Sequence, residues 1–422
     1  MIKRWTKQIS AVDFVVFIGI INLKVSLSTR NKTEVLTMKI KSKSAAILCA
    51  AVLFMTVGCS NGGETSSGSS EPDTSGISGT ADVSGAPDAE TNESGAVSEE
   101  DIMNSLNNGI IIDSVSGNVY KNEMNANPIS PNIFCADPTA VEYDGRLYVY
   151  GTNDQQQAEE GTSNDYAHIK SLVVFSTDDM VNWIYHGRIE VGEIAPWIYN
   201  SWAPSIVSRV EDDGLTHFYL YFSNSGAGVG VITSTNPVGP WTDPLGEPLI
   251  YQDMPGLENC PAPFDPGVCI DGNGVGWLSF GGGTDGARIV RLGSDMLSLD
   301  SEIMKIPSPY HFEASELNYI NGTYVYTYNN DWSGHYENWD MEGVFAPPQC
   351  SMSYLTTKTP LDPDSWVYQD YYFRNPGEQG LEYSNNHTHL QKYQGKYYLF
   401  YHSLFPQSSL GTTGGFRSLC VN

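Results

Sequence analysis

The chain has 422 residues, of which 12% are aromatic, so it is long enough for one large domain or two smaller ones with a sizeable hydrophobic core. Its formal net charge of −27 repels nucleic acids and anionic membrane surfaces but leaves a neutral ligand such as a sugar unaffected. We therefore expect no nucleic-acid partner.

The segment from Met38 to Cys59 has the pattern of an export signal. It begins with basic residues, continues with an apolar stretch too short to span a bilayer comfortably, and ends in small residues before Cys59. It resembles a bacterial lipoprotein signal, which implies lipidation of Cys59 and display on the cell surface, with the membrane reached only through that anchor. Simple secretion is the alternative. Residues 1–37 are interpreted as an upstream extension, and an uncleaved anchor is the competing interpretation.

Residues 60–107 contain no Lys, Arg or aromatic residue and are dominated by Ser, Gly, Asp, Glu, Thr and Ala. Such a composition cannot bury enough apolar surface to fold, so we expect a disordered acidic linker. The seven cysteines (49, 59, 135, 260, 269, 350, 420) follow no metal-binding spacing. Those beyond the linker are predicted to be small buried side chains without a disulfide framework.

One hairpin pattern recurs five times in residues 108–422. Each copy has a polar or aromatic opening residue, a short apolar strand, a turn with Gly and a second strand rich in aromatic residues; the openers are Asp137, Trp202, Asp265, Glu313 and His387. The stretches 171–189, 229–245, 287–304 and 350–373 supply candidates for two more strands per unit. Four-stranded units repeated radially predict an all-β fold, a five-bladed β-propeller, with a β-sandwich of unrelated hairpins as the alternative.

The first strand of each blade lines the propeller axis, so we expect Asp137, Asp265, Glu313 and His387 to point into one funnel. Carboxyls held close together in a medium of low dielectric constant do not all ionise freely, which favours the acid and base pair of glycoside hydrolysis. Trp202, Phe264 and Phe312 are predicted to supply apolar walls for sugar rings. A Ca²⁺ site is one alternative, because Ca²⁺ prefers oxygen ligands, and simple turn formation by the two Asp-Pro pairs is another.

Six motifs in order resemble glycoside hydrolase family 43: "ADPTAVEYDGRLYVYGTND", "STDDMVNW", "WAPSI", "FDPGVCIDGNG", "HFEASELNYINGTYVYTY" and "NNHTHLQKYQGKYYLFYHS". The resemblance runs from about Asn127 to the C-terminus. It implies a five-bladed propeller that cuts arabinose and xylose linkages with inversion and requires no cofactor.

The resemblance also implies residue roles. Asp137 is the expected general base, Glu313 the general acid, and Asp265 the residue that orients the acid and tunes its pKa. His387 is expected near an ion or water on the axis, which leaves a structural Ca²⁺ open, and Arg417 is expected to reach the bound sugar.

Other residues of the same motifs are assigned structural roles. Two positions three apart on a strand fall on opposite faces, so Glu316 is expected to face a neighbouring strand or solvent rather than the axis. Asn153 and Asp154 are interpreted as turn formers, with a substrate contact as the alternative. The segment from Asn329 to Gln349 lacks strand periodicity, and we weigh a subsite-forming loop equally with a packed surface loop.

The C-terminus is interpreted as truncated within the fifth blade, with residues 109–120 proposed as a strand that closes this blade. The favoured activity is release of α-L-arabinofuranosyl units from arabinoxylan by a monomeric extracellular enzyme. A β-xylosidase or endo-arabinanase of the same fold is the first alternative, and a propeller that binds carbohydrate without cutting it is the second.

Overall fold

The computed structural model describes residues 8–17, 20–29, 32–40, 118–120 and 127–422, with gaps at 131, 334, 380–381, 405–406 and 408–412. The chain divides into two units, Met1–Glu90 and Thr91–Asn422. The first contains an antiparallel sheet of β1 (Gln8–Phe17), β2 (Ile20–Thr29) and β3 (Lys32–Ile40), which covers most of the stretch interpreted as an upstream extension and the first three residues of the signal segment. The signal segment beyond Ile40, including Cys59, and the linker 60–107 lie outside the described residues.

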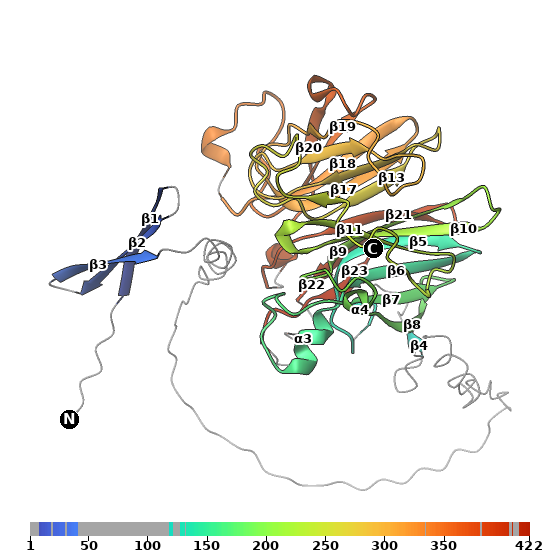
Figure 1. Cartoon of the computed structure of the whole chain (residues 1–422), viewed down its shortest axis with the longest axis horizontal. Helices are drawn as coiled ribbons and strands as arrows, with labels where there is room; N and C mark the ends of the chain where they lie inside the picture. The colour runs from blue at the N-terminus through green and yellow to red at the C-terminus, as the bar shows by residue number, and fades with distance from the viewer. Residues whose placement is uncertain are drawn as a thin grey trace, which may run out of the picture. The chain divides into compact units, whose positions relative to one another are not determined.

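The second unit contains the five predicted sheets, each antiparallel and each built from strands that follow one another in the chain (Figure 1). The first two blades comprise β5 (Ala136–Tyr143), β6 (Arg146–Thr152), β7 (Leu172–Thr177) and β8 (Asn182–Ile189), then β9 (Trp202–Val210), β10 (Thr216–Ser223), β11 (Gly228–Ser234) and β12 (Ile250–Tyr251). The third and fourth comprise β13 (Gly267–Ile270), β14 (Gly276–Phe280), β15 (Arg288–Arg291) and β16 (Met304–Lys305), then β17 (His311–Ile320), β18 (Thr323–Asn330), β19 (Met352–Thr357) and β20 (Val367–Phe373). The fifth comprises β21 (Thr388–Tyr393), β22 (Lys396–Ser403) and β23 (Ser418–Val421).

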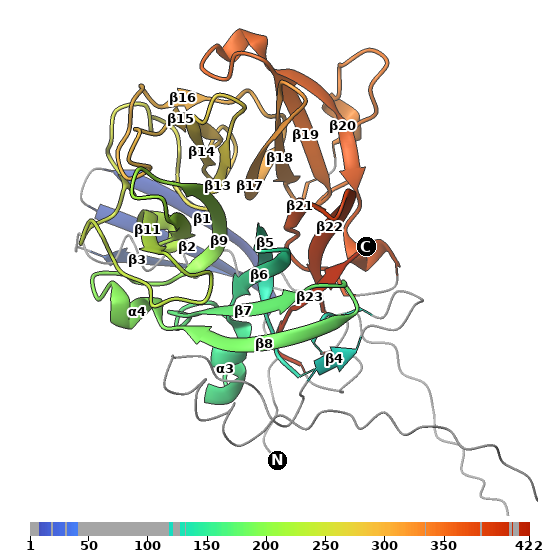
Figure 2. The same ribbon diagram turned by 90° about the vertical axis from the view of Figure 1, so that its right-hand side faces the viewer.

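Figure 2 shows these sheets arranged around a common axis, with β5, β9, β13, β17 and β21 toward the middle. The predicted five-bladed propeller is thus confirmed, and the sandwich alternative is wrong. Tight turns set the hairpin register: Asn321-Gly322 between β17 and β18 has φ values of 50° and 80°, and Gln394-Gly395 between β21 and β22 has 48° and 77°. Two consecutive residues with positive φ give the turn twist that matches antiparallel strands.

Hydrophobic cores lie between neighbouring blades, because each strand of a twisted sheet buries side chains on both faces. Val174 and Tyr150 of the first blade pack with Phe218 and Ile232 of the second. Similar clusters join the second blade to the third, the third to the fourth and the fifth to the first. Because the blades are held mainly by these side-chain contacts, residues at the inner strand starts are positioned by the whole ring.

The ring is closed by a segment preceding the first blade, although not by the predicted one. β4 (Asn118–Tyr120) pairs with β8 at the outer edge of the first blade, so the proposal that it closes the fifth blade is wrong. Residues 109–117 lie outside the described residues. Instead, the amide of Ile129 donates to the carbonyl of Leu419 at 2.8 Å and the amide of Val421 donates to the Asn127 side chain at 2.9 Å. These bonds join the start of the domain to its last described strand.

Helices are short and lie in the connections: α3 (Asp154–Glu160), α4 (Val191–Ile194) and the 3-10 turns η1 (Ser225–Ala227), η2 (Tyr336–Asn338), η3 (Pro363–Ser365) and η4 (Pro376–Gln379). Within the described residues, none of them has the length and apolar character needed to cross a bilayer. Cys135, Cys269 and Cys350 are buried free thiols and Cys260 is a half-buried one, as expected for small apolar side chains.

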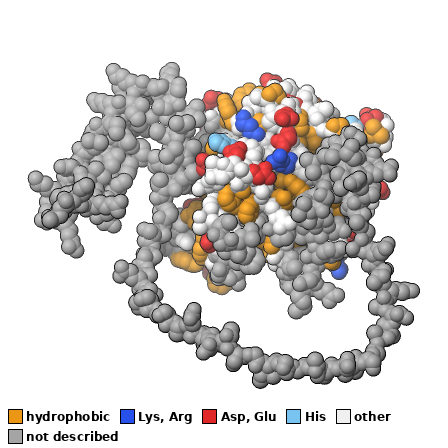
Figure 3. Space-filling view, turned by 90° about the horizontal axis from the view of Figure 1, so that it is seen from below, with side chains coloured by type: hydrophobic (Ala, Val, Ile, Leu, Met, Phe, Trp, Pro, Cys, Tyr) orange, Lys and Arg blue, Asp and Glu red, His pale blue; other side chains and the backbone are white. Residues whose placement is uncertain are grey.

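The face drawn in Figure 3 carries acidic side chains beside a few Lys and Arg side chains, with apolar side chains between them. Ion pairs at the surface include Arg146 with Asp178, 2.7 Å apart. A surface pair of this kind contributes only about 0–1 kcal/mol, so it does little for the stability of the fold.

Candidate active site

The inner strands of three blades share a β-bulge at their starts. Ala136, Trp202 and Glu313 each pair with the neighbouring strand, the register then shifts, and pairing resumes three residues later at Thr139, Ser205 and Glu316. The bulge contains one residue with positive φ, namely Asp137 (54°), Ala203 (40°) and Ala314 (62°); Asp265, just before β13, has the same conformation (52°). Such a bulge adds a residue to one strand and turns the following side chains.

This shared register corrects the sequence alignment of the five openers. Glu313 is equivalent to Ala136 and Trp202, one position ahead of Asp137, rather than to Asp137 itself. Asp137 and Asp265 occupy the positive-φ positions. Glu313 thus reaches the funnel from the preceding position, with a side chain one methylene longer than that of aspartate.

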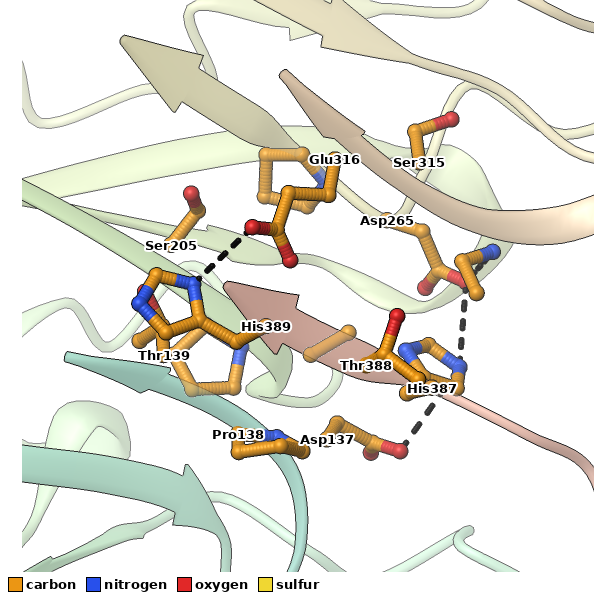
Figure 4. A pocket seen from close by; sticks show the side chains of 14 residues that line it. Asp137, Pro138, Thr139, Ser205, Asp265, Ser315, Glu316, His387, Thr388 and His389 are labelled. Carbon is orange, nitrogen blue, oxygen red and sulfur yellow. Dashed lines mark hydrogen bonds and ion pairs between the residues drawn. The ribbon is translucent and has the colours of Figure 1, made fainter. Parts of the chain in front are cut away.

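Three carboxylates and one imidazole nevertheless meet at one point, as predicted. His387 Nε2 lies 3.6 Å from Asp137 Oδ1, 3.5 Å from Asp265 Oδ2 and 3.9 Å from Glu313 Oε1. Figure 4 shows Asp137 and Asp265 on either side of His387. All four residues are buried. Because these distances exceed ordinary hydrogen-bond lengths, we treat them as close contacts and not as strong ion pairs.

Asp137 is held as a carboxylate. Thr152 Oγ1 donates to its Oδ2 at 2.7 Å and Arg417 Nη1 donates to its Oδ1 at 3.0 Å. Burial by itself raises the pKa of Asp137, but the guanidinium of Arg417 and the nearby His387 outweigh burial and hold that pKa well below its usual range. Asp137 is therefore ionised at neutral pH, as a general base must be.

Glu313 is held in the opposite state. Burial raises its pKa well above the usual range, and the negative charges of Asp265 and Asp137 raise it further. Burial also raises the pKa of Asp265, against the opposing effects of His387 and the Ala314 amide, which donates to Asp265 Oδ2 at 2.8 Å. Glu313 Oε1 is buried and has no hydrogen-bond partner among the described residues. A protonated Glu313 thus has an oxygen available for a substrate.

Arg417 is anchored by Asp154. Asp154 is fully buried and accepts from Arg417 Nη2 at 2.8 Å and from Nε at 2.9 Å. It begins helix α3, so its interpretation as a turn former is wrong; Asn153, just before the helix, donates to Ser171 Oγ at 2.8 Å. The guanidinium also stacks 4.7 Å above the Tyr166 ring.

The position of Arg417 bears on its predicted contact with the sugar. The side chain is only 2% exposed, and its Nε and both terminal nitrogens donate to protein oxygens. The structure shows it bonded to Asp137, while the contact with sugar stays a prediction.

His402 is a site residue that the sequence did not reveal. Its Nδ1 accepts from the backbone amide of Asp137 at 3.2 Å, and its Nε2 lies 2.7 Å from the carbonyl of Asn385. These two bonds require a proton on Nε2 and a lone pair on Nδ1. His402 therefore joins the backbone of Asp137 to the segment that carries Asn385. The side-chain hydrogen bond of Asn385 opposes the rise in the pKa of Glu313.

Glu316 contacts a neighbouring strand, as predicted, but it also lines the axis, which the prediction excluded. The narrow axial cavity is lined by Asp137, Asp265 and His387 together with Ser205, Glu316 and His389 (Figure 4). Strict alternation fails because the bulge at Ala314 lies between Glu313 and Glu316. Glu316 Oε1 lies 3.2 Å from His389 Nδ1 and accepts from the amide of Leu390 at 3.1 Å. Its role is consequently to join the fourth and fifth blades.

Each of the predicted apolar walls directly precedes a residue of the site in the chain: Trp202 precedes Ala203, Phe264 precedes Asp265 and Phe312 precedes Glu313. Trp202 is half-buried, donates through Nε1 to the carbonyl of Tyr166 at 2.9 Å and meets the Tyr166 ring edge to face at 6.2 Å. Phe264 is half-buried and packs so closely on Gly282 that a Cβ there would lie 1.9 Å from its ring. Gly283 donates to the carbonyl of the half-buried Phe312 at 2.6 Å. Sugar binding by Trp202 and Phe264 stays a prediction.

The donor geometry around His387 does not favour a metal. An imidazole nitrogen lies between the three carboxylates, where a cation would have to bind. Among the residues that the structure describes, no group of three or more His, Cys, Asp or Glu side chains has an arrangement that could hold a metal ion. An ion bound to His387 through water stays a prediction.

Comparison with known proteins is consistent with this geometry. The family model described as glycosyl hydrolases family 43 matches residues 125–420. A Bacillus subtilis protein named arabinoxylan arabinofuranohydrolase is 35% identical over 337 residues, covering 73% of this chain and 64% of the relative. A Paenibacillus polymyxa protein of the same name is 32% identical, covering 74% of this chain and 51% of the relative. The chain thus spans between half and two thirds of the length of these relatives.

Solved structures show the same similarity. The crystal structure of a family 43 arabinoxylan arabinofuranohydrolase from Bacillus subtilis in complex with cellotetraose superposes with a TM-score of 0.65 at 34% identity, covering 72% of this chain and 66% of that one. An α-L-arabinofuranosidase from Clostridium thermocellum superposes with a TM-score of 0.54 at 32% identity, covering 68% of this chain and 88% of that one. The chain belongs to glycosyl hydrolases family 43.

Proposed function

We propose that this protein is an inverting glycoside hydrolase that releases α-L-arabinofuranosyl units from arabinoxylan-type polysaccharides. One observation carries the proposal. Asp137 and Glu313 approach the same imidazole nitrogen, yet their pKa values are displaced in opposite directions. A pair of carboxyls of which one is ionised and the other protonated is what glycoside hydrolysis requires. A propeller that only binds carbohydrate does not need one ionised and one protonated carboxyl, so we place the binding alternative second.

Each residue has a definite task in this reaction. Asp137, kept ionised by Arg417, deprotonates a water that attacks the anomeric carbon, while Glu313 gives its proton to the glycosidic oxygen on the opposite face. Asp265 raises the pKa of Glu313 and accepts the amide of Ala314, so it keeps the acid protonated and orients the adjacent backbone.

The carboxyl separation is compatible with inversion. Asp137 Oδ1 and Glu313 Oε1 lie 3.6 and 3.9 Å from one nitrogen and so are at most about 7.5 Å apart. This limit admits the shorter part of the range of about 6.5–9.5 Å that leaves room for a water in inverting enzymes.

The choice of arabinose rests on the relatives. Both curated relatives described above are named arabinoxylan arabinofuranohydrolases, and the Clostridium thermocellum structure is named an α-L-arabinofuranosidase. Other, less similar relatives are named xylosidase/arabinosidase and arabinan endo-1,5-α-L-arabinosidase, so β-xylosidase and endo-arabinanase actions are the alternatives to be tested.

The experiment compares three substrates: nitrophenyl α-L-arabinofuranoside, nitrophenyl β-D-xyloside and arabinoxylan. We expect arabinose release from the first and third, with the opposite anomer as the initial product by NMR, and a loss of roughly 10²–10⁴-fold in kcat for Glu313→Gln on arabinoxylan. Undiminished hydrolysis by the variant would refute the acid assignment. Binding of arabinoxylan without any hydrolysis would favour the carbohydrate-binding alternative.

We also propose that the protein is exported as a monomer and anchored through lipidated Cys59. The basic, apolar and small-residue pattern of Met38–Cys59 supports this. Metabolic labelling with a fatty acid should mark the wild type but not Cys59→Ser; equal labelling of both would contradict lipidation at this residue. A sedimentation experiment tests whether the protein is a monomer. Recovery of the protein from the medium without a fatty-acid label would favour simple secretion.

A further inference from the structure

Backbone amides at the inner strand starts join each of the first four blades to the blade before it in the ring. In these blades the residue with positive φ donates its amide to a side chain of the preceding blade: Asp137 to His402 at 3.2 Å, and Ala203 to Thr152, Asp265 to Ser223 and Ala314 to Asp265, each at 2.8 Å. A buried amide that the strand ladder does not use needs another acceptor. The ring supplies that acceptor from the neighbouring blade.

A second set of such bonds lies three residues further along the inner strands. The amide donors and side-chain acceptors are Ala140 and His389 Nε2 (3.1 Å), Ile206 and Thr139 Oγ1 (3.2 Å), Val268 and Ser205 Oγ (3.0 Å), and Leu390 and Glu316 Oε1 (3.1 Å). The four acceptors line the axial cavity (Figure 4). These polar side chains face the axis because they hold neighbouring blades together.

In the first set, the hydroxyl of Thr152 also bonds the proposed base. A hydroxyl has one proton to donate and two lone pairs that accept. Because the amide of Ala203 can only donate, Thr152 accepts that bond, and its proton remains for Asp137 Oδ2, 2.7 Å away. Thr152 is fully buried, so water does not compete for either bond. The second blade thus fixes the direction in which the hydroxyl donates to the carboxylate.

We propose that Thr152 is a positioning residue for the general base: the second blade orients its hydroxyl, and the hydroxyl holds Asp137 as a correctly placed carboxylate. This inference rests on the proposed function, in which Asp137 activates water. It gives the contact between the first two blades a task in catalysis, whereas the second set of bonds only joins blades.

Thr152→Val removes the hydroxyl while nearly keeping the shape of the side chain. A hydrogen bond to the ionised form favours ionisation, so its loss raises the pKa of Asp137, and the acidic limb of kcat/KM should move to higher pH. We expect kcat on nitrophenyl α-L-arabinofuranoside to fall by about tenfold or more, because a misplaced catalytic group slows the chemical step, with KM changed less than about twofold.

Thr152→Ser is the conservative variant. It keeps the hydroxyl and should restore both kcat and the position of the acidic limb. The other titratable groups that face Asp137 are the same in both variants: Arg417, His387, His402, Asp265, Glu313 and Tyr166. A difference between the two variants therefore reports the hydroxyl.

Thr139→Val is the matched control. Thr139 is also buried and also joins the first two blades, through the amide of Ile206, but within the described residues its hydroxyl bonds none of the three carboxyls. Both Val variants leave one buried amide without an acceptor, so both should lower the melting temperature. Only Thr152→Val should move the acidic limb. If Thr152→Val does not fold, Thr152→Cys provides a weak donor of similar size and should move the limb in the same direction.

The proposal is overturned by an unmoved acidic limb in a folded Thr152→Val, by an equal shift in Thr139→Val, or by a Thr152→Ser variant as impaired as Thr152→Val. If the wild type cleaves no arabinoside or xyloside, the proposed function fails, and NMR tests the positioning role instead. The carbon-13 signal of the Asp137 carboxyl, assigned with Asp137→Asn, should show protonation that begins at a higher pH in Thr152→Val than in the wild type. Equal titration in the two proteins would overturn the positioning role as well.

Discussion

The guanidinium of Arg417, which lies beside Asp137, provides a quantitative test of the site. Arg417 donates to Asp137 Oδ1 at 3.0 Å and is itself anchored by two bonds to the fully buried Asp154. Removing Arg417 alone would leave Asp154 as an unpaired buried charge and destabilise the fold by about 3–5 kcal/mol. The double variant R417Q/D154N removes both charges together and is the appropriate perturbation.

The expected shift follows from the lost hydrogen bond. A hydrogen bond to a charged group contributes about 1.5–3 kcal/mol, and one pKa unit corresponds to 1.36 kcal/mol, so the pKa of Asp137 should rise by about 1–2 units. The base acts only when ionised, and activity on the acid side is lost as the pH falls through its pKa. Because the native pKa is depressed, the double variant should lose activity at a higher pH than the wild type.

The pH dependence of kcat/KM measures this effect, because it reports ionisations of the free enzyme. The acidic limb should move to higher pH, and circular dichroism should show a folded protein throughout the range. The basic limb should move less, since Arg417 acts on Glu313 only as a minor influence on its pKa. An acidic limb that does not move in a folded double variant would refute the assignment of Asp137 as the base held by Arg417.

Three further outcomes are expected. Glu313→Gln should raise the melting temperature at pH 8 but not at pH 4, because above the ordinary pKa of a glutamate the unfolded chain loses the proton that native Glu313 keeps, so the stability cost grows from that pH up to the raised native pKa; an equal gain at both pH values would contradict this. Asp265→Asn should move the basic limb of kcat/KM to lower pH, because loss of its charge lowers the pKa of Glu313, and an unmoved limb would show that Asp265 acts only sterically. Glu316→Ala should lower the free energy of unfolding by about 1–3 kcal/mol in a denaturant titration, since it leaves His389 and the amide of Leu390 without their buried partner, while Glu316→Gln should lower it less and both should keep kcat/KM within about tenfold. Loss of activity in Glu316→Gln on the scale of Glu313→Gln would mean that the acid has been misassigned.

Much of the fold was predictable because the evidence for it is local and repeated. Alternating apolar residues, turn dipeptides such as Asn321-Gly322 and five similar hairpins appear in the chain in order, and a repeated unit that cannot bury its own faces must stack on its neighbours. The grouping of Asp137, Asp265 and Glu313 with His387 followed from this repetition, because strand starts in successive blades converge.

Only the tertiary structure decided which side chains of the inner strands face the axis. The bulge at Ala314 inserts one residue with positive φ, which brings Glu316 to the axis beside His389 and makes Glu313 equivalent to Trp202 rather than to Asp137. A pattern of period two contains no sign of such an insertion, because Ala is not a residue that favours positive φ.

The sequence by itself therefore determined the propeller, its repeat and the identity of the carboxyls in the funnel, since these depend on periodicity and turn chemistry within each hairpin. Only the tertiary structure decided which partners set their charges. Arg417 meets Asp154 across 263 residues, and His402 meets Asp137 across 265. The physical reason is that a buried charge takes whatever partner the closed ring brings to it, and ring closure joins the two ends of the domain in a way that no local spacing encodes.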